Sequence, residues 1–171
     1  GTIYGNGYVN GRGNDVVYSG FVNGETKSEL TGSLVYSGDA QNARNVGSYI
    51  IGVGGLSAQN YQLTYVNGTL DIAKATLDLQ AASDSRTYNG TVASNGTVNV
   101  SGLFGTDKVT GLSQSFDSRN AGSRDLLVNS GYVVDDGNGG NNYAVVTHTA
   151  SGNIAKATLD LQAASDSRTY N

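Results

Sequence analysis

Few side chains in this sequence are of a type that could carry out catalysis. His148 is the only histidine, so a Ser-His-Asp triad would have to use it. It lies in the run VVTHTAS, at an outward-facing position of a predicted strand, and the sequence contains no Gly-x-Ser-x-Gly elbow. The only glutamates are Glu25 and Glu29, and the aspartates form no convergent pair. We therefore expect a protein that is not an enzyme and needs no cofactor.

One loop carries the hard oxygen ligands that Ca²⁺ prefers. It has the sequence DDGNGGNN at residues 135–142, and its candidate ligands are Asp135, Asp136, Asn138 and Asn142. The loop lacks the bidentate Glu of a complete EF-hand pattern. Because Gly, Asn and Asp are also the usual residues of turns, we expect a structural turn without metal and keep a calcium site as the alternative.

The elements that must position these residues are predicted to be β-strands. Short apolar runs alternate with turn signals, and the dipeptide Asn-Gly, which suits tight hairpins, occurs seven times. The predicted strands include YQLTYVNGTLDI at 61–72, TLDLQA at 76–81 and YAVVT at 143–147. The sequence therefore predicts an all-β fold of small antiparallel domains in tandem. An Ig-like sandwich is the preferred form, with a β-grasp-like arrangement as the alternative.

An exact internal repeat sets the domain organisation. The stretch IAKATLDLQAASDSRTYN fills residues 72–89 and returns unchanged at 154–171, which is 82 residues further on. Such a period is too long for one coil of a solenoid and matches a small domain. We therefore predict a domain at 1–74 that lacks its first strand, a complete domain at 75–156, and the first strand and turn of a further unit at 157–171.

Side-chain parity supports a boundary near Lys74. Leu77 and Leu79 share one face of a predicted strand. If that strand continued back across Lys74, the apolar residues before Lys74 would lie on the opposite face unless the register slipped by one residue. We expect both leucines to be buried in the second domain. Their copies in the repeat, Leu159 and Leu161, should fill the same place in the first domain of a neighbouring copy.

Composition excludes several classes of partner and site. The net charge is −4 and the sequence pI is about 4.7, so there is no basic surface of the kind that binds nucleic acid. The chain contains no Cys, which excludes disulfides and thiolate ligands. No apolar run is long enough to span a bilayer as a helix, and we expect no membrane insertion of this segment.

Several motifs resemble the MBG and YDG domains of giant bacterial adhesins. The first domain is similar to MBG domains, and the second domain is similar to YDG domains, with Asn89 at the position where the family name implies Asp. Within these motifs we expect Gly47 and Gly122 to form turns before strands, and Tyr61 and Tyr143 to cap the cores. The motifs are IYG (3–5), SGFVNGETKSELTG (19–32), NVGSYIIGVGGLSAQNYQLTYVNGTLDIAKATL (45–77), RTYNGT (86–91), VSGLFGTDKV (100–109), NAGS (120–123) and NNYAV (141–145).

The resemblance implies a structural function. Proteins with such domains are filamentous-haemagglutinin-like, are exported by two-partner or related routes, and form stalks or fibres in cell adhesion and biofilm matrix. For this chain we therefore expect an extracellular location on a Gram-negative bacterium. Its expected partners are further copies of the repeat, joined end to end by continuous chain or by strand complementation. A glycan-binding or partner-binding adhesive module is the alternative.

Overall fold

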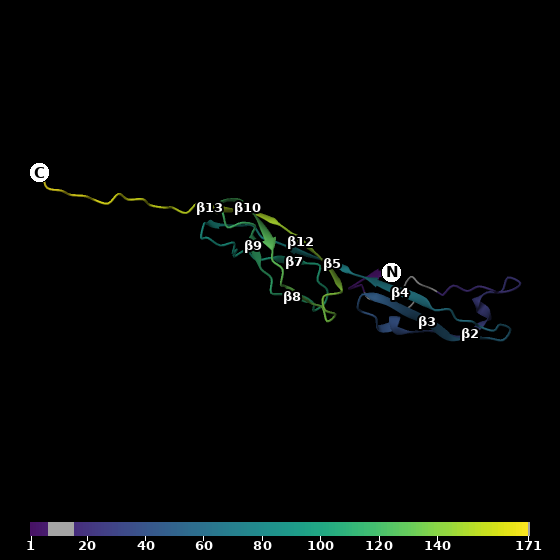
Figure 1. Ribbon diagram of the computed structural model, residues 1–171. Helices are drawn as coiled ribbons and strands as arrows, with labels where there is room; N and C mark the ends of the chain where they lie inside the picture. The colour runs from purple at the N-terminus through teal and green to yellow at the C-terminus, as the bar shows by residue number, and fades with distance from the viewer. Residues whose placement is uncertain (7–15, 171) are drawn as a thin grey trace. The chain divides into compact units, whose positions relative to one another are not determined.

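The computed structural model describes residues 1–6 and 16–170, and the regular secondary structure of these residues is almost entirely β-strand (Figure 1). The all-β prediction is therefore confirmed. The Asn-Gly turn predicted at 10–11 lies outside the described residues. The helical elements of the described chain are two short 3-10 helices, η1 (Lys27–Glu29) and η2 (Asp39–Asn42). No helix in this part of the chain is long and apolar enough to cross a lipid bilayer.

Two compact units make up the described chain. The first contains Gly1–Leu77, Ser101–Thr110 and Val133–Val146, so it combines residues of both predicted domains. Its main sheet has the strand order β1-β4-β3-β2. A two-stranded antiparallel ribbon, β8-β11, belongs to the same unit. The bounds are β1 Thr2–Ile3, β2 Leu30–Ser37, β3 Gly47–Ala58, β4 Gly68–Ala73, β8 Lys108–Thr110 and β11 Val133–Asp135.

The second compact unit contains the remaining residues, 78–100, 111–132 and 147–171. Its sheet has the order β6-β13-β10-β9. The bounds are β6 Asp84–Thr87, β9 Gln114–Phe116, β10 Gly122–Val128 and β13 Ala150–Ala155. Ala81, Phe116, Leu126 and Ile154 form its buried apolar core.

A third sheet has the strand order β12-β5-β7. Its strands are β5 (Ala75–Gln80), β7 (Asn99–Ser101) and β12 (Tyr143–His148). The N–H groups of Ala75 and Ala81 donate to the carbonyls of Asn142 and His148. Because these bonds have the same spacing on both strands, β5 and β12 run in parallel. The side chains of Leu77 and Leu79, on the inner face of β5, are both 0% exposed.

Not all strand pairs are antiparallel, contrary to the expectation from the sequence. β1 lies parallel to β4, and β6 lies parallel to β13. Both pairs place the beginning of a domain beside its end. Parallel neighbours cannot be joined by a tight hairpin, so turn signals between adjacent strands give no indication of this pairing.

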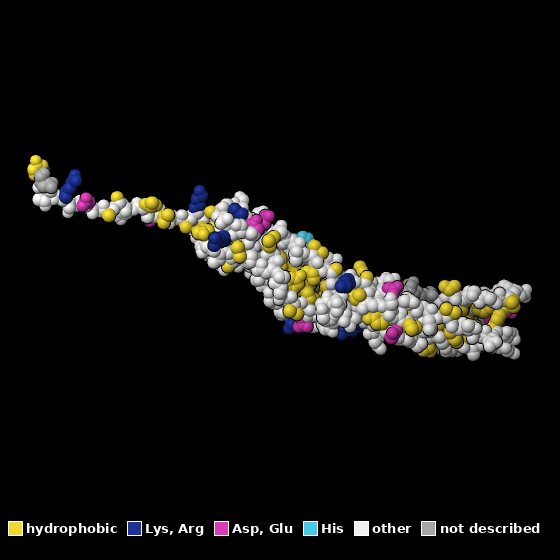
Figure 2. Space-filling view, viewed as in Figure 1, with side chains coloured by type: hydrophobic (Ala, Val, Ile, Leu, Met, Phe, Trp, Pro, Cys, Tyr) yellow, Lys and Arg dark blue, Asp and Glu magenta, His cyan; other side chains and the backbone are white. Residues whose placement is uncertain are grey.

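Two segments with strand-like sequences have no strand partner among the described residues. The strand predicted at 61–72 is paired only from Gly68 onward, as part of β4. Residues 156–170, at the yellow end of Figure 1, form no strand, and their side chains are exposed. Figure 2 shows separate hydrophobic and charged side chains along this C-terminal segment. Strand formation needs a neighbouring strand, because backbone hydrogen bonds in a sheet are made between strands.

Candidate functional site

The hydroxyl of Tyr143 makes two hydrogen bonds within the first compact unit. It donates to Oδ2 of Asp107 at 2.6 Å and accepts the backbone N–H of Phe104 at 2.9 Å. The backbone between these two partners forms a tight turn, because the N–H of Asp107 donates to the carbonyl of Phe104 and Gly105 has φ 58°. We call Phe104, Asp107 and Tyr143 the tyrosine corner of the second domain.

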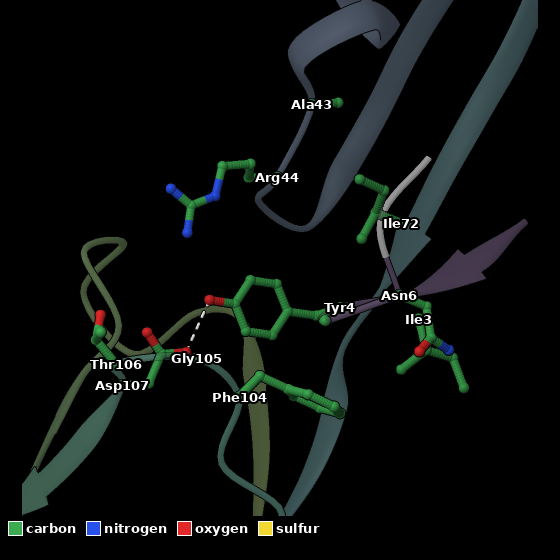
Figure 3. A pocket seen from close by; sticks show the side chains of 11 residues that line it. Ile3, Tyr4, Asn6, Ala43, Arg44, Ile72, Phe104, Gly105, Thr106 and Asp107 are labelled. Atoms are coloured by element: carbon green, nitrogen blue, oxygen red, sulfur yellow. Dashed lines mark hydrogen bonds between the residues drawn. The ribbon is translucent and has the colours of Figure 1, made fainter. Parts of the chain in front are cut away.

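Tyr4, which follows β1 of the first domain, completes this corner (Figure 3). Its hydroxyl donates to the same Oδ2 atom of Asp107 at 2.7 Å. Its ring meets Tyr143 edge to face with centroids 5.2 Å apart, and meets Phe104 at 6.1 Å. Edge-to-face pairs of this kind are favourable beyond their buried area. Arg44 lines the same hollow of about 200 Å³.

Both hydroxyls in the corner are held in the protonated form. Burial, followed by the hydrogen bond to Asp107, raises the pKa of Tyr143 well above its ordinary value. The same two causes, in the same order, raise the pKa of Tyr4. A phenol with a raised pKa is a poor nucleophile or base at neutral pH, so this geometry fits a structural contact.

The first domain has an equivalent corner. The hydroxyl of Tyr61 donates to the carboxylate of Glu25 and accepts the backbone N–H of Val22 at 3.1 Å. The N–H of Glu25 donates to the carbonyl of Val22, and Asn23 has φ 53°, close to the angle of Gly105. Each residue of this corner stands 82 positions before its counterpart in the second domain.

A second link between the two domains centres on Asn142, which is 0% exposed. Its Nδ2 donates to Oδ1 of Asn45 at 3.1 Å, and its Oδ1 accepts the N–H of Val46 at 2.9 Å. Its Oδ1 also accepts Nδ2 of Asn138 at 3.0 Å. The side chain is therefore well hydrogen bonded, which offsets the cost of burying an amide.

The loop that could hold Ca²⁺ uses its oxygens for the fold. Oδ1 of Asp136 accepts the N–H groups of Asn138 and Gly140, both at 2.7 Å, and its Oδ2 accepts the N–H of Asn142 at 3.0 Å. Asp135 forms an exposed ion pair with Lys108 at 3.7 Å. In the described part of the chain, no three His, Cys, Asp or Glu side chains are placed to hold a metal ion.

Acid should destabilise this loop selectively. Burial raises the pKa of Asp136, but the backbone N–H groups of Asn142, Gly140, Asn138 and Asp136 itself together outweigh it, so the pKa lies below the ordinary 3.8. A lowered pKa in the folded state means that the charged form stabilises the fold, fully above the unfolded pKa and progressively less as the pH falls through the folded pKa. We expect the free energy of unfolding to fall below about pH 4.

The measurement is urea unfolding as a function of pH. Asp136→Asn should be less stable at neutral pH and should lose less stability in acid, whereas Asp135→Asn should behave like the wild type, since its ion pair is exposed. Identical acid profiles for Asp136→Asn and the wild type would contradict this assignment.

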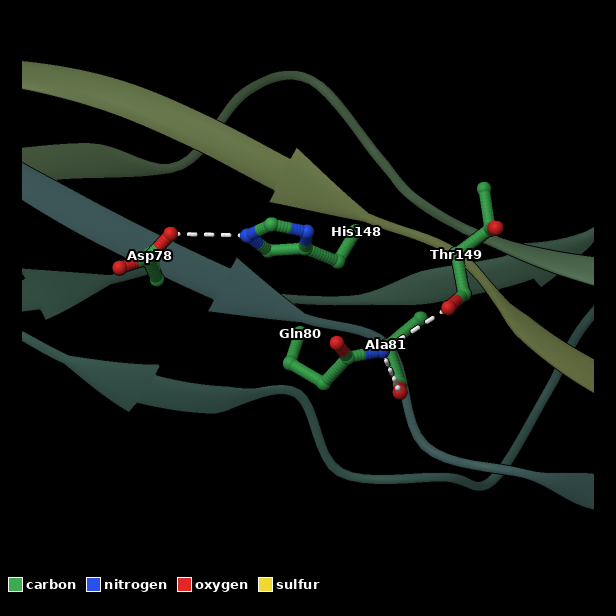
Figure 4. A network of polar contacts seen from close by, with 5 residues as sticks. All are labelled: Asp78, Gln80, Ala81, His148 and Thr149. Atoms are coloured by element: carbon green, nitrogen blue, oxygen red, sulfur yellow. Dashed lines mark hydrogen bonds and ion pairs between the residues drawn. The ribbon is translucent and has the colours of Figure 1, made fainter.

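His148 forms a pair with Asp78, as Figure 4 shows. Its Nε2 lies 2.8 Å from Oδ1 of Asp78, and both side chains are partly exposed. Beside them, Nε2 of Gln80 donates to the carbonyls of Ala81 and Thr149. No hydroxyl among the described residues is hydrogen bonded to the His148 ring. These contacts join β5 to the end of β12 and the residue after it, and they do not form a nucleophile–base pair.

Of the remaining residues singled out from the sequence, Gly47 and Gly122 lie in the framework of strands, and Leu159 and Leu161 lie in the exposed C-terminal segment. Gly47 and Gly122 are the first residues of β3 and β10, with φ angles of 158° and 132°. Tyr143 is 3% exposed, whereas Leu159 and Leu161 are 82% and 86% exposed in this chain. Sequence reasoning missed the carboxylate partners and the part played by Tyr4. Glu25 and Asp107 are separated by the same 82 positions as Tyr61 and Tyr143, and this shared spacing could have indicated the two carboxylates.

Comparison with known protein families gives two matches that follow each other along the chain. Residues 2–71 match the family model of the MBG domain (YGX type), and residues 73–151 match that of the YDG domain. Comparisons with curated proteins and with solved structures gave no significant match. Tyr4 and Asn45 thus lie in one family domain, and Asp107, Asn142 and Tyr143 lie in the other. The chain therefore carries an MBG domain of the YGX type followed by a YDG domain.

Proposed function

We propose that this chain is a structural repeat segment of a secreted bacterial surface adhesin or biofilm-matrix filament. It extends a stalk or fibre and has no catalytic activity. Its location is extracellular, on a Gram-negative bacterium, and its partners are further repeats end to end. The single observation that carries this proposal is the joint formed by Tyr4 with the tyrosine corner of the YDG domain.

Both sides of this joint have counterparts in the other domain. The N–H of Tyr88 donates to the carbonyl of Ala155 at 2.8 Å, just as the N–H of Tyr4 donates to that of Ala73 at 2.9 Å. Tyr88 is 39% exposed, whereas Tyr4 is 6% exposed. The MBG domain in turn has its own tyrosine corner, centred on Tyr61. Repeating the joint with these counterparts would add domains in series, which supports a modular stalk.

The connection between the domains is also short. Lys74 is the single residue between the end of β4 at Ala73 and the beginning of β5 at Ala75. A flexible linker of the Gly/Ser type needs a longer polar stretch. A connection of one residue, combined with the tyrosine joint, suits a segment that transmits tension along a chain.

The joint itself should contribute to stability. We expect Tyr4→Phe to lower the free energy of unfolding by about 1.5–3 kcal/mol, because one hydrogen bond to the charged carboxylate of Asp107 is lost and the ring is kept. Tyr88→Phe is the matched control, since its hydroxyl has no hydrogen-bond partner among the described residues. Thermal unfolding of both variants checks this, and equal shifts would argue against the joint.

The function is tested on cells that produce the parent protein. Antibodies raised against this chain should label intact cells or their matrix. Purified chain added in excess should not inhibit adhesion, because a stalk segment does not contact the target. Inhibition by the purified chain would favour the alternative of an adhesive module that binds glycan or a partner. Labelling only after lysis would overturn the extracellular location.

A further inference from the structure

The MBG domain has a groove at the place where the YDG domain has β5. In the YDG domain, β5 lies between β7 and β12. By the constant spacing of the repeat, the counterparts of β7 and β12 in the MBG domain are residues 17–19 and 61–66. Neither segment is in a strand. Both line one groove of about 850 Å³, and side chains of β2 and β3, among them Leu34, Ile51 and Val53, line it too.

A pair of glycines indicates that a strand is missing from this groove. Gly102 and Gly20 are counterparts and have the same φ of 98°. A Cβ at Gly102 would lie 2.4 Å from the carbonyl oxygen of Thr76 in β5, so the backbone of β5 passes directly over Gly102. At Gly20 no described atom lies within 4 Å of the same position. The backbone is thus shaped for a close neighbour that the described residues do not provide.

Exposure of the apolar side chains leads to the same conclusion. Val98 and Tyr143, beside β5, are 7% and 3% exposed. Their counterparts Val16 and Tyr61 are only half-buried, and Val66, at the end of the second wall, is 80% exposed. Figure 2 shows hydrophobic side chains at the surface of this part of the molecule, near β2 and β3. Covering such a surface is favourable in proportion to the apolar area removed from water.

We propose that this groove binds residues 157–163 of a second copy of the chain as an added β-strand. These residues are identical in sequence to 75–81, which contain β5. The leucines of the segment, Leu159 and Leu161, are exposed here, whereas Leu77 and Leu79 are fully buried. The segment thus has the sequence that fills this position in the YDG domain. This assignment deepens the proposed function, on which it rests, by naming the surfaces that join successive repeats.

The register of the added strand follows from that of β5. Ala75 and Ala81 donate to the carbonyls of Asn142 and His148. In the groove, the N–H groups of Ala157 and Ala163 should therefore donate to the carbonyls at positions 60 and 66. In the YDG domain, the chain that follows β5 forms β6, which pairs with β13. In the MBG domain the equivalent place beside β4 is already taken by β1, so the added strand should end near residue 163.

Two complementary variants test the proposal on the full chain. Leu159→Asp combined with Leu161→Asp disables the strand, and Gly20→Ala blocks the groove, since its Cβ would meet the incoming carbonyl. We expect the wild type to self-associate with rising concentration in sedimentation velocity. Each variant alone should stay monomeric, and their equimolar mixture should form a complex with one copy of each.

Gly24→Ala is the matched control for backbone strain. Gly24 has φ 75° and, like Gly20, no described atom within 4 Å of an added Cβ, but it does not line the groove. The Gly24→Ala chain should associate like the wild type, and circular dichroism should show both alanine variants folded. A monomeric wild type, a mixture that stays monomeric, or undiminished association of the aspartate variant would each overturn the proposal.

A disulfide test checks the register. Asp160 and Val66 are the counterparts of the close pair Asp78 and His148, and the chain has no native cysteine. Asp160→Cys in one chain and Val66→Cys in another should cross-link under mild oxidation, whereas the exposed control Val22→Cys should not. A cross-link formed within one doubly substituted chain at high dilution would instead assign the groove to its own C-terminal segment. These tests use purified protein, so a negative result would overturn the strand-binding groove without deciding the adhesion experiment, and the reverse also holds.

Discussion

Replacing Leu77 with alanine should destabilise the YDG domain by about 2–5 kcal/mol, the usual cost of removing a buried leucine. Leu159→Ala should leave the free energy of unfolding of the dilute chain unchanged within about 0.5 kcal/mol, as for other exposed positions. Leu77 is 0% exposed and Leu159 is 82% exposed, although identical residues surround both in the sequence. Local propensity is therefore the same, and only burial differs.

Urea unfolding at low protein concentration measures this difference. The slope of the unfolding free energy against urea should be the same for both variants, so that the midpoints can be compared directly. At high concentration, Leu159→Ala should instead weaken self-association, because the strand that it carries is proposed to bind the groove of another copy. Similar losses for the two variants in the dilute chain would mean that the C-terminal segment is buried in its own chain.

Gly102→Ala should be the more damaging of two equivalent glycine substitutions. Both Gly102 and Gly20 have φ 98°, so an alanine at either position carries a backbone penalty of about 1–2 kcal/mol. At Gly102 the new Cβ would also lie 2.4 Å from the carbonyl oxygen of Thr76, which forces the backbone of β5 to move. Overpacking of this kind typically adds about 1–3 kcal/mol.

The backbone penalty is common to Gly102→Ala and Gly20→Ala. The difference between their losses of unfolding free energy therefore measures the effect of a strand that lies over the glycine. Calorimetry or urea unfolding of the dilute variants gives this difference. If Gly20→Ala were as damaging as Gly102→Ala, a strand would already lie over Gly20 in the single chain. That result would contradict the proposed strand-binding groove as well as this prediction.

The fold class follows directly from the sequence, and the pairing of the strands does not. Alternating apolar residues and Asn-Gly turns are local signals, and they are enough to predict an all-β chain and the inward faces of Leu77 and Leu79. The parallel pairs β1/β4 and β6/β13 bring together residues from opposite ends of a domain. No local pattern specifies which distant strand will be the neighbour.

The joint is only partly predictable for a similar reason. The sequence indicates that Tyr61 and Tyr143 are equivalent residues that cap a core. The role of Tyr4 depends on its approach to Asp107, a residue more than a hundred positions away in the chain. For the loop around Asp136 the sequence predicts a turn or a calcium site, and the three N–H donors to one carboxylate become visible only in the folded backbone.

The repeated stretch separates these two levels of information most clearly. By itself, the sequence at 72–89 and 154–171 determined an alternation of apolar and polar side chains, and hence a segment able to form a strand with one apolar face. Tertiary structure decided whether that strand exists. At 75–80 the neighbours β7 and β12 supply hydrogen-bond partners and a core, and β5 forms between them. At 157–162 the described residues supply neither hydrogen-bond partners nor a core, and the identical residues remain exposed. The reason is that a β-strand depends on other parts of the fold for its hydrogen bonds and its burial.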